Sequence, residues 1–167
     1  IAIVLFITFA FRKVSEPVSS WKYGLVTILA LVHDVIVPTG VFILFTHLHG
    51  GEIDLLFVAA ILAILGYSVH DTIVVFDRVR ENLRLNKENH ANEDFETTVG
   101  KSVSQTFGRS INTSLTIFLV LVALYFLGGE TTRDFAFLLL VGVVAGTYSS
   151  IFLASPLLIT LEKWGRK

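Results

Sequence analysis

The sequence predicts an all-α bundle of membrane-spanning helices. Hydrophobic residues make up 53% of the 167 residues and charged residues only 16%, a composition far more apolar than that of soluble domains. The apolar residues also form long segments, four of which reach the ~20 residues that a helix needs to cross a bilayer core. Cysteine is absent, which excludes disulfides and thiolate sites.

The chain opens within an apolar segment. Residues 1–11 would extend only about 16 Å as a helix, too short for a bilayer core, which needs ~20 residues. The segment also lacks the basic region and cleavage site of a signal peptide. We therefore expect residues 1–11 to be the end of a transmembrane helix that is truncated here.

Four longer apolar segments are predicted to be full spans: residues 23–45, 55–76, 111–127 and 135–161. The connections between them alternate in basic content, and 12 of the 13 Lys and Arg residues fall on one side, the exception being Arg133. The positive-inside rule makes that side cytoplasmic. The C-terminus is therefore expected in the cytoplasm, with the two short loops outside.

The longest connection, residues 77–110, is predicted to be a cytoplasmic loop that contains an amphipathic helix. Asn92 is a suitable N-cap, and apolar residues then recur at every fourth position: Phe95, Val99, Val103 and Phe107. Such a stripe is typical of one helix face. The pattern favours a helix that lies on the bilayer surface, and the alternative is a surface that docks on a partner.

Small residues recur at every fourth position of the last span: Gly142, Gly146, Ser150 and Ala154. A stripe of this kind lets two membrane helices approach closely. We expect it to pack against another helix, within this chain or in a partner.

Two spans carry a carboxylate inside the apolar segment, Asp34 and Asp71, each preceded by a histidine, His33 and His70. A charge at the centre of a membrane helix costs ~2.5–3.5 kcal/mol on insertion scales, and such residues usually mark ion or proton pathways. The expected use is movement of a proton or an ion across the membrane.

Arg109 is the predicted partner of Asp71. Asp71 lies in the cytoplasmic half of its span, and Arg109 lies at the cytoplasmic boundary of the third full span, beside hydroxyl and amide residues that begin at Ser110. Desolvation favours a protonated carboxyl group, whereas a nearby guanidinium favours the ionised form. A carboxylate that alternately meets and leaves Arg109 would therefore load and release a proton. The alternative is a static salt bridge.

The surroundings of Asp34 are less specific. Pro38 lacks the N–H that would bond the Asp34 carbonyl, which predicts a kink beside the carboxylate. His33 and His70 are possible proton relays, or histidines hydrogen-bonded within the bundle. The four residues His47, His49, Glu52 and Asp54 crowd an outer loop, but their spacing matches no closed zinc site, and we expect no metal there.

The segment from Gly66 to Asn82, GYSVHDTIVVFDRVREN, strongly resembles the fourth transmembrane segment of the SecF family of protein-export membrane proteins. Residues 32–36, 105–110 and 146–151 resemble the third, fifth and sixth segments, so the resemblance covers essentially the whole chain. It implies a first helix and a periplasmic domain before residue 1.

The resemblance also implies a function. The chain would form half of a twelve-helix SecD–SecF assembly in the bacterial inner membrane, related to the resistance–nodulation–division transporters. That assembly associates with the SecYEG channel and uses the proton gradient to help complete preprotein export. Asp71 and Arg109 match the residues implicated in proton conduction, and Asp34 matches a recurrent carboxylate. Protons would be the coupling ion, with no other cofactor, no nucleic-acid partner and no enzymatic activity.

Two other classes of protein stay open. Two aspartates on neighbouring helices could share a proton, as in an intramembrane aspartyl protease, although the Tyr-Asp and Gly-x-Gly-Asp motifs of those enzymes flank neither Asp34 nor Asp71. The chain could also be a structural membrane subunit whose ion pairs fix helix packing.

Overall fold

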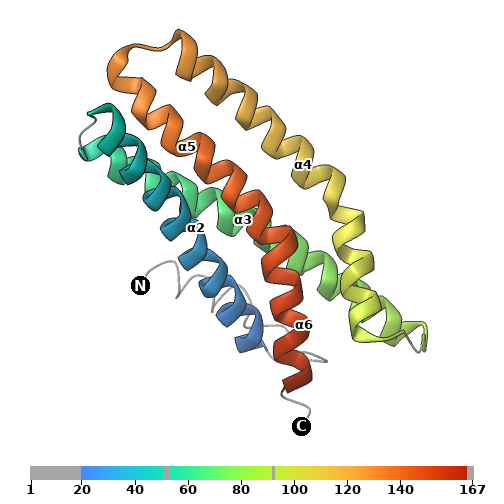
Figure 1. Cartoon of the computed structure of the whole chain (residues 1–167). Helices are drawn as coiled ribbons and strands as arrows, with labels where there is room; N and C mark the ends of the chain where they lie inside the picture. The colour runs from blue at the N-terminus through green and yellow to red at the C-terminus, as the bar shows by residue number, and fades with distance from the viewer. Residues whose placement is uncertain (1–19, 51–52, 92, 165–167) are drawn as a thin grey trace.

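The computed structural model describes residues 20–50, 53–91 and 93–164, which form a bundle of helices (Figure 1). Its elements are α2 (Ser20–His49), α3 (Leu55–Glu88), α4 (Phe95–Leu127), α5 (Glu130–Tyr148), the π-helix η1 (Ser149–Leu153) and α6 (Ala154–Trp164). Within these residues four helical stretches are long and apolar enough to cross a membrane, the fourth being α5, η1 and α6, which run on as one. The predicted four full spans are confirmed. The helix expected at residues 1–11 lies outside the described residues.

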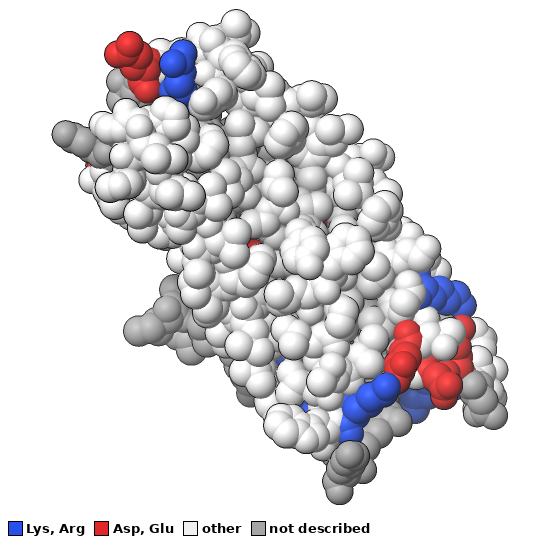
Figure 2. Space-filling view, in the orientation of Figure 1, with Lys and Arg blue, Asp and Glu red and all other residues white. Residues whose placement is uncertain are grey.

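Helix α5 lies at the centre of the arrangement and contacts α2, α3 and α4. We call the end of the bundle that holds the start of α2, the α3–α4 connection and the end of α6 the basic end. The opposite end holds the α2–α3 and α4–α5 connections. Figure 2 shows charged side chains gathered at the two ends of the visible face, separated by a wide, almost uncharged band. Such a band is what a hydrocarbon core requires.

The connection between the second and third full spans is shorter than the sequence predicted. Helix α3 continues to Glu88 and α4 already begins at Phe95, so most of residues 77–110 extends these two helices. Val99 is buried in the core, where Phe95 and Val103 pack against the same cluster. The first three residues of the apolar stripe thus face the interior of the bundle, in place of the bilayer-surface or partner-docking helix that the pattern suggested, whereas Phe107 is exposed. Asn92, the expected cap, is outside the described residues.

Polar side chains fasten the extended parts of α3 and α4 together. The Asn82 amide donates to Ser102 Oγ and to Gln105 Oε1, both at 2.8 Å. Nearer the connection, Asn86 Nδ2 donates to Glu93 Oε2 at 2.8 Å. This hydrogen bond is the main cause that holds the pKa of Glu93 below its ordinary value, because it favours the ionised carboxylate.

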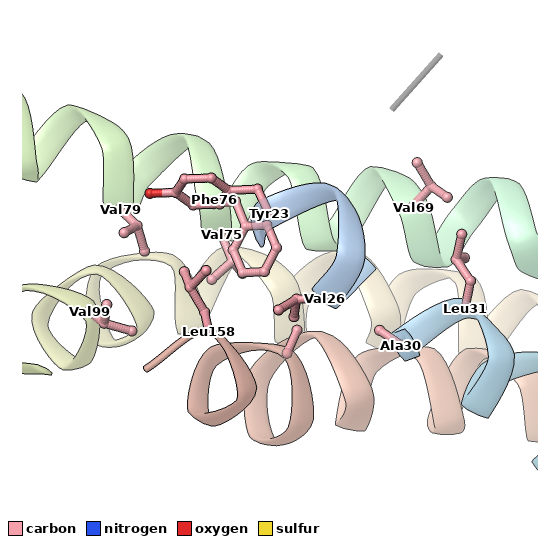
Figure 3. Close-up of a cluster of buried hydrophobic side chains, with 11 residues drawn as sticks. Tyr23, Val26, Ala30, Leu31, Val69, Val75, Phe76, Val79, Val99 and Leu158 are labelled. Carbon is pink, nitrogen blue, oxygen red and sulfur yellow. The ribbon is translucent and has the colours of Figure 1, made fainter. Parts of the chain in front are cut away.

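The main apolar core lies toward the basic end, where side chains of α2, α3, α4 and α6 meet (Figure 3). The ring of Tyr23 meets that of Phe76 edge to face, with centroids 5.3 Å apart. Beside this core, Lys22 Nζ and Glu162 Oε2 form a buried ion pair at 2.8 Å. The pair joins the first turn of α2 to the last turn of α6.

The small-residue stripe of the last span lies against α3. A Cβ added at Gly142 would overlap the side chain of Ile64, and one added at Gly146 would lie 3.4 Å from the Cβ of Ser68. Ala154, farther along, is fully buried in the main core. The close approach of these two helices brings polar groups of α3 and η1 within hydrogen-bond distance of each other.

Candidate functional site

Two carboxylates are buried in the interior of the bundle. Asp34 on α2 is 0% exposed and Asp71 on α3 is 7% exposed. Each accepts hydrogen bonds from two serine hydroxyls that other helices supply. A buried carboxylate needs such donors, because an unpaired charge in a low-dielectric interior is costly.

Asp34 has three polar partners. Its Oδ2 accepts from Ser68 Oγ of α3 and from Ser149 Oγ of η1, the latter at 2.7 Å. Its Oδ1 lies 2.8 Å from Nδ1 of His33. The carboxylate therefore links α2 to α3 and to η1. Helix α2 itself runs on through Pro38.

Asp71 has one serine partner at each carboxylate oxygen. Ser110 Oγ of α4 donates to Oδ1 at 2.8 Å, and Ser150 Oγ of η1 donates to Oδ2. Both serines are almost completely buried. Three helical segments thus converge on this carboxylate.

The π-helix η1 supplies a donor to each carboxylate. Single-turn π-helices occur often at functional sites. The hydroxyls of Ser149 and Ser150 each lie 3.1 Å from a second acceptor, the carbonyl three residues earlier. A hydroxyl has one proton and two lone pairs. Each serine can therefore donate to an ionised Asp, or accept from a protonated one while it donates to its own backbone.

Arg109 does not lie at Asp71 in this structure. Its side chain is exposed, and among the described residues no ion pair includes it. The reason is geometric: consecutive residues of a helix point about 100° apart, so when Ser110 faces into the bundle, Arg109 faces out. The structure thus puts a neutral donor where the sequence predicted a guanidinium.

The two histidines differ in position. The side chain of His33 is 26% exposed, and it lines an open groove of about 440 Å³ between α2, α4 and α5 together with Phe118 and Tyr148. It therefore connects Asp34 to the surface of the bundle. His70 is exposed and lies beside Asp71 in the chain without sharing its serine contacts.

The polar residues of the outer loop have local roles. Asp54 caps α3 by accepting from the backbone N–H of Phe57 at 3.1 Å. Nδ1 of His49 lies 3.0 Å from the carbonyl oxygen of Phe45. Glu52 lies outside the described residues, and His47 is exposed near the end of α2.

Sequence reasoning missed two of the four serines. Ser110 stood out as a polar neighbour of Arg109 and Ser150 as a small residue of the packing stripe, but Ser68 and Ser149 were not singled out as partners of Asp34. Ser68 and Ser149 are conspicuous in the sequence only as hydroxyl residues inside apolar spans. Their positions in the sequence do not show which helix each hydroxyl faces.

The comparisons with known proteins agree with this fold. Residues 1–164 match the family described as protein export membrane protein SecD/SecF, C-terminal. Two curated relatives are protein translocase subunits SecF. The one from Thermobaculum terrenum is 51% identical over 97% of this chain and 49% of its own length. The one from Anaerolinea thermophila is 43% identical over 97% of this chain and 51% of its own length.

A crystal structure of SecDF in a super-membrane-facing form is similar in fold as well as in sequence. It superposes with a TM-score of 0.81 at 38% identity, covering 99% of this chain and 20% of the SecDF chain. The chain spans about half the length of the curated relatives that it matches.

Proposed function

Because the chain belongs to the SecD/SecF family of protein-export membrane proteins, we propose that it is the SecF-type membrane half of a SecD–SecF assembly. In this proposal the assembly works with the SecYEG translocon and uses proton flow to assist late steps of preprotein translocation. Curated relatives named as translocase subunits and the similar SecDF structure support the proposal.

The single observation that carries proton coupling is the setting of Asp71. A buried carboxylate whose donors are hydroxyls can be satisfied in both protonation states, since a hydroxyl donates to the ionised form and accepts from the protonated form. Ser150 has the second acceptor that this reversal needs, the carbonyl of Thr147 at 3.1 Å. Both protonation states of Asp71 would therefore be hydrogen-bonded in the arrangement seen here.

Arg109 would act in a second arrangement of α4. A rotation of this helix by one residue, about 100°, would replace Ser110 with Arg109 at the carboxylate. A guanidinium favours the ionised form, so its arrival would expel the proton from Asp71. Asp34 would be an accessory carboxylate, which His33 connects to the groove on the bundle surface. The exposed position of His70 supports no comparable relay.

The chain would be a multi-pass protein of the bacterial inner membrane. With the basic end in the cytoplasm, as the positive-inside rule requires, the C-terminus is cytoplasmic. The large apolar side chains exposed on the bundle, such as Ile36, Leu62 and Val120, would contact lipid or SecD. Protons would be the coupling ion, and exported preproteins the substrate.

The two other classes of protein have less support. In an aspartyl protease two carboxylates share one proton, whereas here each has its own serine donors, and no hydrogen bond joins Asp34 to Asp71 within the described residues. A purely structural subunit would tolerate loss of the Asp71 charge in export but not in assembly, and the variant below separates the two.

The decisive variant is Asp71→Asn in the full-length chain assembled with SecD. We expect it to abolish proton-dependent stimulation of preprotein export into membrane vesicles while co-purification with SecD persists. Asp77→Asn is the matched control, because Asp77 lies on the same helix with a side chain that is 72% exposed. Persistent stimulation would overturn proton coupling at Asp71. Loss of assembly would favour the structural subunit, and substrate cleavage abolished by Asp71→Asn would favour the protease.

A further inference from the structure

Three hydroxyl groups from three helices meet near Asp71 without contacting it. Tyr67 Oη of α3 lies 2.5 Å from Ser114 Oγ of α4 and 3.2 Å from Thr147 Oγ1 of α5. The two smaller hydroxyls lie 2.7 Å apart. We call these three residues the hydroxyl cluster.

The hydroxyl cluster is stacked on the Asp71 site, displaced toward the opposite end of the bundle. Tyr67 precedes Asp71 by one helical turn, Thr147 precedes Ser150 by one turn, and Ser114 follows Ser110 by one turn. Helix α4 runs antiparallel to α3 and α5, so all three displacements point the same way. Helix α3, helix α4 and the continuous α5–η1 segment, which supply Asp71 and its two serines, each contribute one hydroxyl to the adjacent layer.

The hydroxyls of the cluster have more acceptors than protons. Thr147 Oγ1 lies 2.7 Å from Ser114 Oγ and also 2.7 Å from the carbonyl of Val143, although it has a single proton to donate. Ser114 Oγ lies 2.7 Å from the carbonyl of Ser110, the residue whose side chain donates to Asp71. Hydroxyls with two acceptors can reorient between them, which is what the passage of a proton requires.

The hydroxyl cluster lies behind the wall of an open groove of about 340 Å³. Ser114 and Thr147 line this groove together with apolar side chains of α4, α5 and η1, among them Phe118, Val144 and Phe152. The surface that faces the groove is almost entirely apolar, and Ser114 is buried. The oxygens of the cluster therefore face one another inside the bundle, shielded from the apolar groove.

We propose that Tyr67, Ser114 and Thr147 form a proton relay that passes protons to Asp71 from the side of the opposite end of the bundle. The contact of the cluster toward Asp71 ends on the backbone carbonyl of Ser110, so a water molecule would have to bridge the last gap between a cluster hydroxyl and the carboxylate. At each step a hydroxyl, or this water, accepts the arriving proton on its oxygen and releases its own to the next oxygen. The cluster therefore neither gains nor loses protons, and the Asp71 carboxylate is the final acceptor. The proposal rests on proton coupling at Asp71.

The test removes one hydroxyl at a time with little change of shape, by Tyr67→Phe, Ser114→Ala and Thr147→Val. The full-length chain is assembled with SecD in proteoliposomes, and proton flux under an imposed pH gradient is measured per folded protein. We expect each variant to lower the flux about tenfold, the equivalent of one hydrogen bond, and Ser114→Thr to retain it. Thr116→Val is the control, because the Thr116 hydroxyl is exposed on α4 and bonds only within its own helix, to the Asn112 carbonyl.

Asp71→Asn separates this proposal from the one on which it rests. If Asp71→Asn abolishes the flux and the three cluster variants retain it, the hydroxyl cluster is not a relay and proton coupling at Asp71 still stands. If Asp71→Asn retains the flux, proton coupling itself fails. If the cluster variants lower only the melting temperature, the hydroxyls merely hold the helices together, and the proposal is overturned.

Discussion

Ser149 and Ser150 are consecutive in the chain, yet their hydroxyls donate to carboxylates on two different helices, Asp34 on α2 and Asp71 on α3. The π-helix that holds both serines joins α5 to α6. A displacement of this one segment would therefore change the hydrogen bonding of both carboxylates together. This gives the two sites a physical link that does not require them to touch.

Removal of the Ser150 hydroxyl should affect proton coupling more than removal of the Ser149 hydroxyl. Ser150→Ala deprives Asp71 of one of its two donors, and a hydrogen bond to a charged group contributes ~1.5–3 kcal/mol. Asp34 keeps Ser68 and His33 after Ser149→Ala. We expect proton-dependent export stimulation to fall strongly in the first variant and mildly in the second, measured with the full-length assembly in membrane vesicles.

Ser155→Ala is the control for these two variants. Ser155 is buried in α6, and its hydroxyl has no hydrogen-bond partner among the described residues. Its removal should leave stimulation unchanged and keep or raise the melting temperature, since an unpaired buried polar group is destabilising. Equal losses in Ser149→Ala and Ser150→Ala would contradict the assignment of separate carboxylates to the two serines.

Arg109→Gln should alter function without altering stability. Loss of one partner from a buried ion pair costs about 3–5 kcal/mol, whereas a change at an exposed side chain is usually within about 0.5 kcal/mol. Because Arg109 is exposed here, we expect an unchanged melting temperature and a loss of proton-dependent stimulation. A large fall in the melting temperature would mean that Arg109 is paired in the resting fold.

The fold was predictable because a membrane-spanning helix needs a long apolar segment, and such segments are easily recognised in a sequence. Four long apolar segments and an uneven distribution of basic residues suffice to find the spans. How far α3 and α4 extend beyond these spans was not predicted, because the sequence does not show which side chains Asn82 and Asn86 meet. In the structure these amides find partners across the hairpin.

The site was predictable only in part, for a similar reason. A carboxylate in an apolar span is conspicuous, so Asp34 and Asp71 stood out. The residues near Arg109 do not show how α4 is rotated about its own axis. A rotation of about 100°, the angle between consecutive residues, decides whether Arg109 or Ser110 faces Asp71. The π-helix that orients Ser149 and Ser150 has no sequence signature of its own.

The buried ion pair at the basic end should be important for stability. Glu162→Gln leaves the Lys22 ammonium without its carboxylate in a site where the side chains are only 10% and 7% exposed. We expect a loss of about 3–5 kcal/mol in the free energy of unfolding, measured by thermal denaturation of the detergent-solubilised assembly. Glu88→Gln is the control: its pair with Arg84 is well exposed, and such pairs contribute about 0–1 kcal/mol. Similar losses in both variants would contradict the burial of the Lys22–Glu162 pair.

The contact between Gly142 and Ile64 should make the last span intolerant of even one added methyl group. Gly142→Ala places a Cβ on the Ile64 side chain, and overpacking of this kind costs about 1–3 kcal/mol. At Gly100, within α4, a Cβ would meet nothing within 4 Å, so Gly100→Ala should instead gain up to ~1 kcal/mol from helix propensity. Ile64→Ala removes the atoms that Gly142→Ala would meet, and the double variant should therefore lose less stability than the sum of the two single losses. Additive losses in thermal denaturation would show that the two residues are not in contact, because sites without shared contacts add within ~0.5 kcal/mol.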